Sequence, residues 1–212
     1  MPMKCESITP RNFMPRKKTD LWFKKETISR GRVEEARTSE NWMQLACNLE
    51  ELSDARKSIY EAAKNGKRVQ IIDSIELGDE ISSGGRYLVR PPLVGRDAGI
   101  LSNTLHASGI SAVVLCREPS TSLGLCPIVS LGSGVMVRVQ IEEPPNAEKP
   151  TCAWFDHAVE ELGEHVLGKM NTESTPVRQL DYLLAHIPAV PTHVGLYKAA
   201  ILLCQTLQAK TV

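Results

Sequence analysis

The segment GVMVRVQIE, residues 134–142, shows the clearest strand pattern of the chain. Its β-branched apolar residues occupy every second position, and a period of two places them on one face of a strand while the residues between them face the other way. The alternating apolar residues are Val135, Val137, Val139 and Ile141. The pattern therefore predicts a strand that buries one face and leaves the other in water.

Four more short apolar runs precede this segment, and turn-forming residues separate them. Val and Ile are frequent in these runs, as they are in strands generally. We therefore expect a mixed or mostly antiparallel sheet of about five short strands within residues 68–142. The four runs are residues 68–77, 86–94, 110–117 and 125–131.

Helical periodicity flanks the predicted sheet and interrupts it once. Residues 39–65 repeat apolar side chains at spacings of three and four, with Ser39 as the expected N-cap and Arg56 as an interruption of the stripe. Asp97 is the expected N-cap of an inserted helix over residues 98–107. Further apolar stripes predict a C-terminal helical cluster over residues 153–169, 180–187 and 192–208. The predicted fold class is α+β, with an N-terminal helix, a central sheet and a C-terminal helical cluster.

The charges of the chain are unevenly placed, although the formal net charge of its 212 residues is zero. Residues 1–33 hold nine Lys or Arg and three Asp or Glu, so this segment carries +6 and residues 34–212 carry −6. The segment shows no helical or strand periodicity, so we expect a flexible, mostly extended basic arm. The remaining residues, 34–212, are expected to form a single α+β domain that folds without the arm.

Aromatic side chains accompany the cations of this predicted arm. Cations neutralise phosphates and aromatic rings stack on bases, so we expect the arm to bind RNA or another polyanion. The expected contact residues are Arg16, Lys17, Lys18, Trp22, Phe23, Lys24, Lys25, Arg30 and Arg32. An anionic membrane surface is one alternative partner. In a second alternative, Trp22 and Phe23 dock on the domain or on an acidic protein partner.

The layout of a basic arm on an acidic body resembles that of capsid, matrix and accessory nucleic-acid-binding proteins, a group that includes viral proteins. The resemblance concerns layout alone. It implies a non-enzymatic structural or binding protein. We also expect a homo-oligomer, because joining several arms raises avidity for a long polyanion.

A second group of cations lies beside glycines. Arg86, Arg90 and Arg96 accompany turns at residues 84–96, where a glycine backbone could approach a phosphate and arginines could hold it. This leaves open a small enzyme or a phosphate-ligand-binding domain. However, the chain contains neither of the common glycine-rich nucleotide-binding motifs nor a nucleophile elbow. We therefore expect no catalytic residues and no cofactor.

The cysteines and histidines do not show the close pairs of a structural zinc site. Cys152 and His157 are separated by four residues, and Cys116 and Cys126 by nine. Zinc sites of that kind need four converging ligands, usually in close pairs, so we expect no metal.

The sequence also bears on where the protein resides. No apolar run approaches the length of a membrane span, and residues near the N-terminus show no apolar signal stretch. The six cysteines are too sparse for a disulfide scaffold and are expected to be free thiols in a reducing compartment. We therefore expect a cytoplasmic protein, with a nuclear location left open, that is not secreted and has no membrane span.

Overall fold

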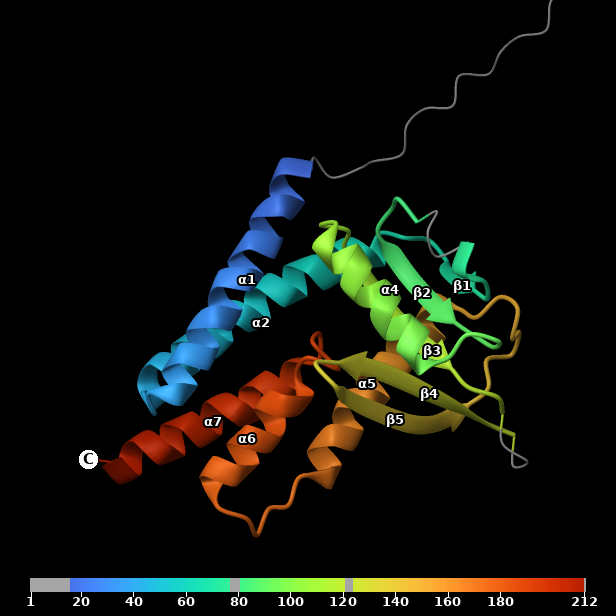
Figure 1. Cartoon of the computed structure of the whole chain (residues 1–212). Helices are drawn as coiled ribbons and strands as arrows, with labels where there is room; N and C mark the ends of the chain where they lie inside the picture. The colour runs from blue at the N-terminus through green and yellow to red at the C-terminus, as the bar shows by residue number, and fades with distance from the viewer. Residues whose placement is uncertain (1–15, 77–80, 121–123, 212) are drawn as a thin grey trace, which may run out of the picture.

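Five strands form one mixed sheet in the computed structural model, which describes residues 16–76, 81–120 and 124–211 (Figure 1). The strand order follows the chain order. The first three strands run parallel, and the last two pair antiparallel to their neighbours. The strands are β1 (Val69–Ile72), β2 (Gly85–Val89), β3 (Ala112–Arg117), β4 (Leu125–Gly132) and β5 (Val135–Glu142).

The helices account for most of the remaining described residues. Within these ranges they are α1 (Arg16–Thr38), α2 (Trp42–Lys64), α4 (Gly95–Ala107), α5 (Cys152–Lys169), α6 (Pro176–His186) and α7 (Val194–Thr211). All of them except α1 correspond to predicted helices. The predicted α+β class with a mixed five-stranded sheet is confirmed. None of the helices in the described ranges is long and apolar enough to cross a membrane.

Two connections set the strand directions. α4 carries the chain from β2 to β3, and a helical crossover is the usual link between parallel neighbours. β4 and β5 are joined by Ser133 and Gly134, whose φ angles of 48° and 81° are both positive. Two consecutive positive φ angles are typical of a type I′ turn, whose twist fits a tight antiparallel hairpin. On β5, Val137, Val139 and Ile141 are buried while the intervening residues are exposed, as the alternation predicted.

Helices cover both faces of the sheet (Figure 1). α4 packs on β2, β3 and β4, over a core that includes Tyr87, Val89 and Cys116. α2 and α5 pack against strands of the sheet over a second core, which includes Leu88 and Leu115 and extends to α6 and α7. Neighbouring strand residues point to opposite faces, so one strand supplies both cores.

α1 is the main departure from the prediction, since residues 1–33 were expected to be extended. Residues 16–38 are helical and pack on α2, so the predicted boundary at residue 33 lies inside a helix. Residues 1–15 of the predicted arm lie outside the described residues. The buried side chains of α1 recur at spacings of three and four and are Phe23, Glu26, Ser29, Val33 and Ala36. Two of these five are polar, so the sequence shows no apolar stripe here.

The predicted caps also need correction. Asn41, and not Ser39, caps α2, because its Oδ1 accepts a hydrogen bond from the Gln44 amide at 3.1 Å. Ser39 instead donates from Oγ to the Glu35 carbonyl at the end of α1. Asp97 lies within α4, where its carboxylate accepts from the Val94 amide at 2.8 Å. It thus satisfies the start of the helix from inside the first turn.

Candidate nucleic-acid interface

Four cations of α1 are exposed: Lys24, Lys25, Arg30 and Arg32. We call these four residues the basic ridge. Arg32 lies 3.4 Å from Glu51 in a solvent-exposed ion pair, which is worth little in free energy. Within the described part of the chain, Lys24, Lys25 and Arg30 form no ion pair. The basic ridge therefore retains cations that an external anion could neutralise.

The helix backbone adds positive charge at the start of α1. Lys25 and Arg32 of the basic ridge are seven residues apart, so they share a face and lie about 10 Å from one another along the axis. The side chains of Arg16, Lys17 and Lys18 lie outside the described residues, but their backbone forms the first turn of α1. The N-terminal end of a helix also carries a partial positive charge. The backbone thus makes this end of α1 positive.

One acid of α1 is turned away from this surface. Glu26 is only 2% exposed, and its Oε1 accepts hydrogen bonds from Arg56 Nε at 3.0 Å and Nη2 at 2.9 Å. Arg56 Nη1 in turn donates to the hydroxyl of the buried Tyr197 at 2.9 Å. This network ties α1 to α2 and α7. Because Arg56 neutralises Glu26 internally, Glu26 does not offset the basic ridge.

Glu26 is held in its charged form. Burial alone would raise its pKa, but the nearby His106 imidazole and the Arg56 guanidinium outweigh burial and lower the pKa to about 2. The second carboxylate oxygen, Oε2, lies 3.3 Å from His106 Nε2. Since His106 belongs to α4, the carboxylate also lies beside the helix that packs on the opposite face of the sheet from α2.

The two aromatic residues predicted to stack on bases lie in different environments. Phe23 is buried, and its ring meets His106 edge-on, with ring centroids 5.0 Å apart. Its prediction as a base-stacking residue is therefore wrong, because the ring is part of the packing between α1 and α4. Trp22 is half-buried and lines an open groove between α1 and α2, together with Lys25, Lys57 and the exposed acid Asp54. Of the two, Trp22 is thus the one that combines an accessible aromatic surface with neighbouring cations.

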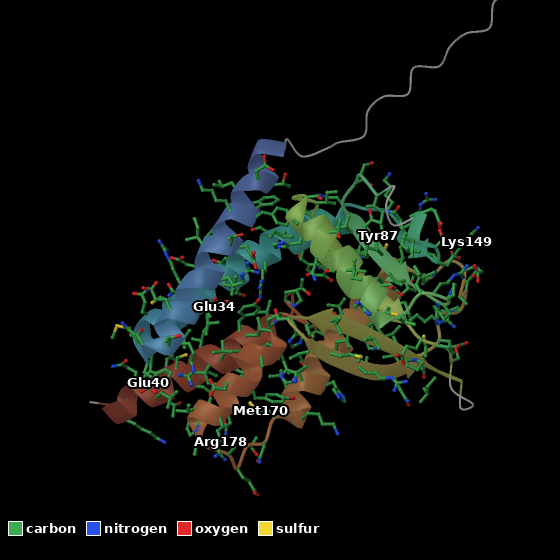
Figure 2. The ribbon with its side chains drawn as sticks, in the orientation of Figure 1. Glu34, Glu40, Tyr87, Lys149, Met170 and Arg178 are labelled. Carbon is green, nitrogen blue, oxygen red and sulfur yellow. The ribbon has the colours of Figure 1, made fainter. Side chains whose placement is uncertain are left out.

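The far end of α1 has a different charge. Glu34 and Glu35 are exposed there, and Figure 2 places Glu34 and Glu40 towards the turn into α2. Arg37 donates to both carboxylate oxygens of Asp181 on α6, at 2.7 and 3.0 Å. The candidate interface is therefore confined to the part of α1 that precedes Glu34.

Arg86, one of the three arginines predicted to bind an anion, is a structural residue. It is 4% exposed, and its Nε and Nη2 donate to the two carboxylate oxygens of Asp156 at 2.8 and 2.9 Å. Its Nη1 donates to the carbonyls of Lys64 and Gly66. All three guanidinium nitrogens are engaged, so Arg86 is not available to an external phosphate.

The other two arginines of this group do not complete a phosphate site with Arg86. Arg90 donates to Asp73 at 2.8 Å and to Glu148 at 2.6 Å, so two carboxylates already neutralise it. Arg96 is exposed near the start of α4. The geometry therefore gives no support to the phosphate-binding alternative at residues 84–96.

A cluster that the sequence did not predict lies on α5. Glu160 and Glu164 both approach the buried His193, which precedes α7. The spacing of the two glutamates places them on one helix face, but nothing in the sequence indicates that His193 folds onto that face. The expectation that the chain holds no metal was based on cysteine and histidine spacing, which does not detect this arrangement.

The chain matches no protein-family model, no curated protein and no solved structure. A function for it therefore has to be argued from the side chains described above.

Proposed function

We propose that α1 is the RNA-binding element of a non-enzymatic binding protein, with the basic ridge as its principal contact. The observation that supports this is the sorting of charge on α1. Four cations face solvent, whereas Glu26 is buried and neutralised by Arg56. Asp20 is then the one exposed acid on α1 ahead of Glu34. A surface of this kind attracts a phosphate backbone and releases its counterions.

Single-stranded RNA fits this surface better than a duplex does. Trp22 lies beside Lys25 in the groove between α1 and α2. An unpaired base could stack on the indole while its phosphates contact the cations, and such stacking tolerates any base. We therefore expect weak sequence preference and strong dependence on salt.

We also propose that the protein forms a homo-oligomer and resides in the cytoplasm or the nucleus. Each subunit offers only a short cationic surface, so joining several of them raises avidity along one RNA strand. Light scattering on the full chain measures the mass of the particle, and a monomeric mass at working concentrations contradicts this part of the proposal.

The experiment compares three partners for the full-length chain at low salt. A labelled single-stranded RNA, the matching RNA duplex and anionic lipid vesicles are titrated with protein, and binding is followed by fluorescence anisotropy or by co-sedimentation. We expect the single strand to bind most tightly. Binding to vesicles alone would identify α1 as a membrane-surface helix. Absence of binding to all three would favour docking on an acidic protein.

A further inference from the structure

We propose that Glu160, Glu164 and His193 form a binding site for a divalent transition-metal ion such as Zn²⁺. One potential ligand atom of each residue lies within 4.8 Å of those of the other two. The site involves α5 and the residue before α7, so it shares no residue with the basic ridge. It is therefore independent of the proposed RNA binding.

The distances suit a metal ion. His193 Nε2 lies 3.2 Å from Glu160 Oε1 and 3.3 Å from Glu164 Oε1. A tetrahedral zinc site with bonds of about 2.0–2.1 Å keeps its ligand atoms about 3.3 Å apart. Imidazole nitrogen and carboxylate oxygen are both ordinary zinc ligands. Three protein ligands leave a coordination position for water, on the side where the two glutamates are exposed.

A hydrogen bond alone does not explain why both carboxylates converge. The nitrogen Nε2 can carry at most one proton, which satisfies one acceptor well. The side chains of Glu160 and Glu164 are 64% and 59% exposed, so either could extend into water. Instead two like charges one turn apart approach the same atom, an arrangement that costs free energy unless a positive charge, on the imidazole or on a metal ion bound to it, lies between them.

The imidazole itself is built into this position. The His193 side chain is 2% exposed, and its Nδ1 is buried without a hydrogen-bond partner among the described residues. The polar contacts of the ring therefore run through Nε2, towards the two carboxylates. A Cβ on Gly163 would lie 2.1 Å from the ring, and one on Gly195 would lie 2.7 Å from it.

The glycine at position 163 shows that α5 gives up helix propensity to make room for the His193 ring. Glycine inside a helix costs about 1 kcal/mol relative to alanine, and Gly163 lies in the middle of α5 between the two glutamates. Only a residue without a side chain admits the ring at this point. Gly163 therefore lowers the local stability of α5 but leaves room for the His193 ring, whose Nε2 lies against the two carboxylates.

The free Nδ1 also predicts the strength of the site. A metal on Nε2 leaves the ring proton on Nδ1, and metal-binding histidines usually donate that proton to an acceptor. The described residues supply none. We therefore expect an affinity roughly 10- to 100-fold weaker than that of a comparable site whose histidine donates its other ring proton to an acceptor.

The test is calorimetric titration of the chelator-treated full chain with Zn²⁺, followed by Co²⁺ as a spectroscopic probe. We expect one site per chain and a Co²⁺ spectrum without thiolate bands. The double variant Glu160→Gln/Glu164→Gln should lose affinity by about 100-fold or more, because loss of an outer-shell partner alone costs roughly 10- to 100-fold. Both glutamates are exposed, so the variant is expected to fold.

Two matched variants separate this site from general attraction of cations. Glu160→Asp/Glu164→Asp keeps both charges but shortens both side chains, and it should also lose Zn²⁺. Glu161→Gln removes a neighbouring acid that approaches His157, and it should bind as the parent does. Full affinity in the aspartate variant, or equal losses in all three variants, would overturn the proposal. Thiolate bands in the Co²⁺ spectrum would assign the metal to cysteine and overturn it as well.

Discussion

Glu26 of α1 and Arg56 of α2 form a buried ion pair, with 2.9 Å between Glu26 Oε1 and Arg56 Nη2. Their side chains are 2% and 10% exposed, so neither charge is solvated by water. Removing one partner of such a pair leaves the other charge buried and uncompensated. The pair therefore keeps Glu26 on the buried face of α1, and not on the solvent-exposed surface that holds the basic ridge.

We expect Glu26→Ala to lower the free energy of unfolding by about 3–5 kcal/mol, because Arg56 is then left buried without its carboxylate. The double variant Glu26→Gln/Arg56→Met should cost much less than the sum of its single changes, since it removes both charges together. Urea unfolding of the parent, Glu26→Gln, Arg56→Met and the double variant measures this coupling. Glu34→Ala, at an exposed position of the same helix, is the control and should change stability by less than about 0.5 kcal/mol. Equal effects of Glu26→Ala and Glu34→Ala contradict the assignment.

The low pKa of Glu26 predicts how stability depends on acid. Its pKa is about 2 in the folded protein and 4.5 as the ordinary value, so the folded state favours the charged form. This contribution to stability is complete above pH 4.5 and is lost as the pH falls towards 2. Glu26→Gln lacks the titrating group, so its unfolding free energy should fall less steeply over that range. If the unfolding free energies of the parent and the variant fall equally steeply between pH 4.5 and 2, Glu26 is not the group that causes the loss of stability in acid.

Removal of residues 1–38 should destabilise the protein strongly. The sequence alone indicated that residues 34–212 fold without the arm, but α1 buries Phe23, Val33 and Ala36 and supplies the partner of Arg56. We expect the truncated chain to lose its cooperative thermal transition or to melt far below the parent. A variant with all four residues of the basic ridge changed to Gln retains the buried face and should melt close to the parent. An unchanged melting temperature in the truncated chain contradicts the packing of α1.

Trp22→Ala and Phe23→Ala should have different consequences. Phe23 is buried against His106, so its replacement should cost about 3–5 kcal/mol of stability. Trp22→Ala should instead weaken binding of single-stranded RNA by about 1–3 kcal/mol and leave the salt dependence of binding unchanged, because stacking releases few counterions. Thermal melting and RNA titration of both variants separate the two roles. A steep loss of stability in Trp22→Ala with RNA affinity retained would assign Trp22 to packing.

The sheet could be predicted from the sequence because its signal is local. β5 alternates buried and exposed residues along one strand, and the tight turn at Ser133 and Gly134 adjoins it. α1 could not be predicted in the same way. Its buried face includes Glu26, which becomes compatible with the core only when Arg56 from another helix neutralises it.

The candidate sites, like α1, depend on contacts between residues that are far apart in the sequence. That Lys24 and Lys25 are cationic is evident from the sequence, but whether a cation is free depends on distant partners. Arg86 is engaged by Asp156, which lies 70 residues further along the chain, so no local pattern distinguishes it from an anion ligand. The cluster around His193 was missed for the same reason, because it forms only when the residue before α7 packs on α5.

Titration of single-stranded RNA with the full chain across a series of salt concentrations tests the central proposal most directly. The comparison is between the parent, a ridge variant with Lys24, Lys25, Arg30 and Arg32 changed to Gln, and a control with four other exposed lysines changed to Gln. The control positions are Lys67, Lys149, Lys169 and Lys198. We expect the ridge variant to bind RNA more weakly than the parent. The slope of its log affinity against log salt should fall in magnitude by about 0.7 for each phosphate that it no longer neutralises. The control should bind as the parent does. Unchanged low-salt affinity and slope in the ridge variant would contradict RNA binding by α1.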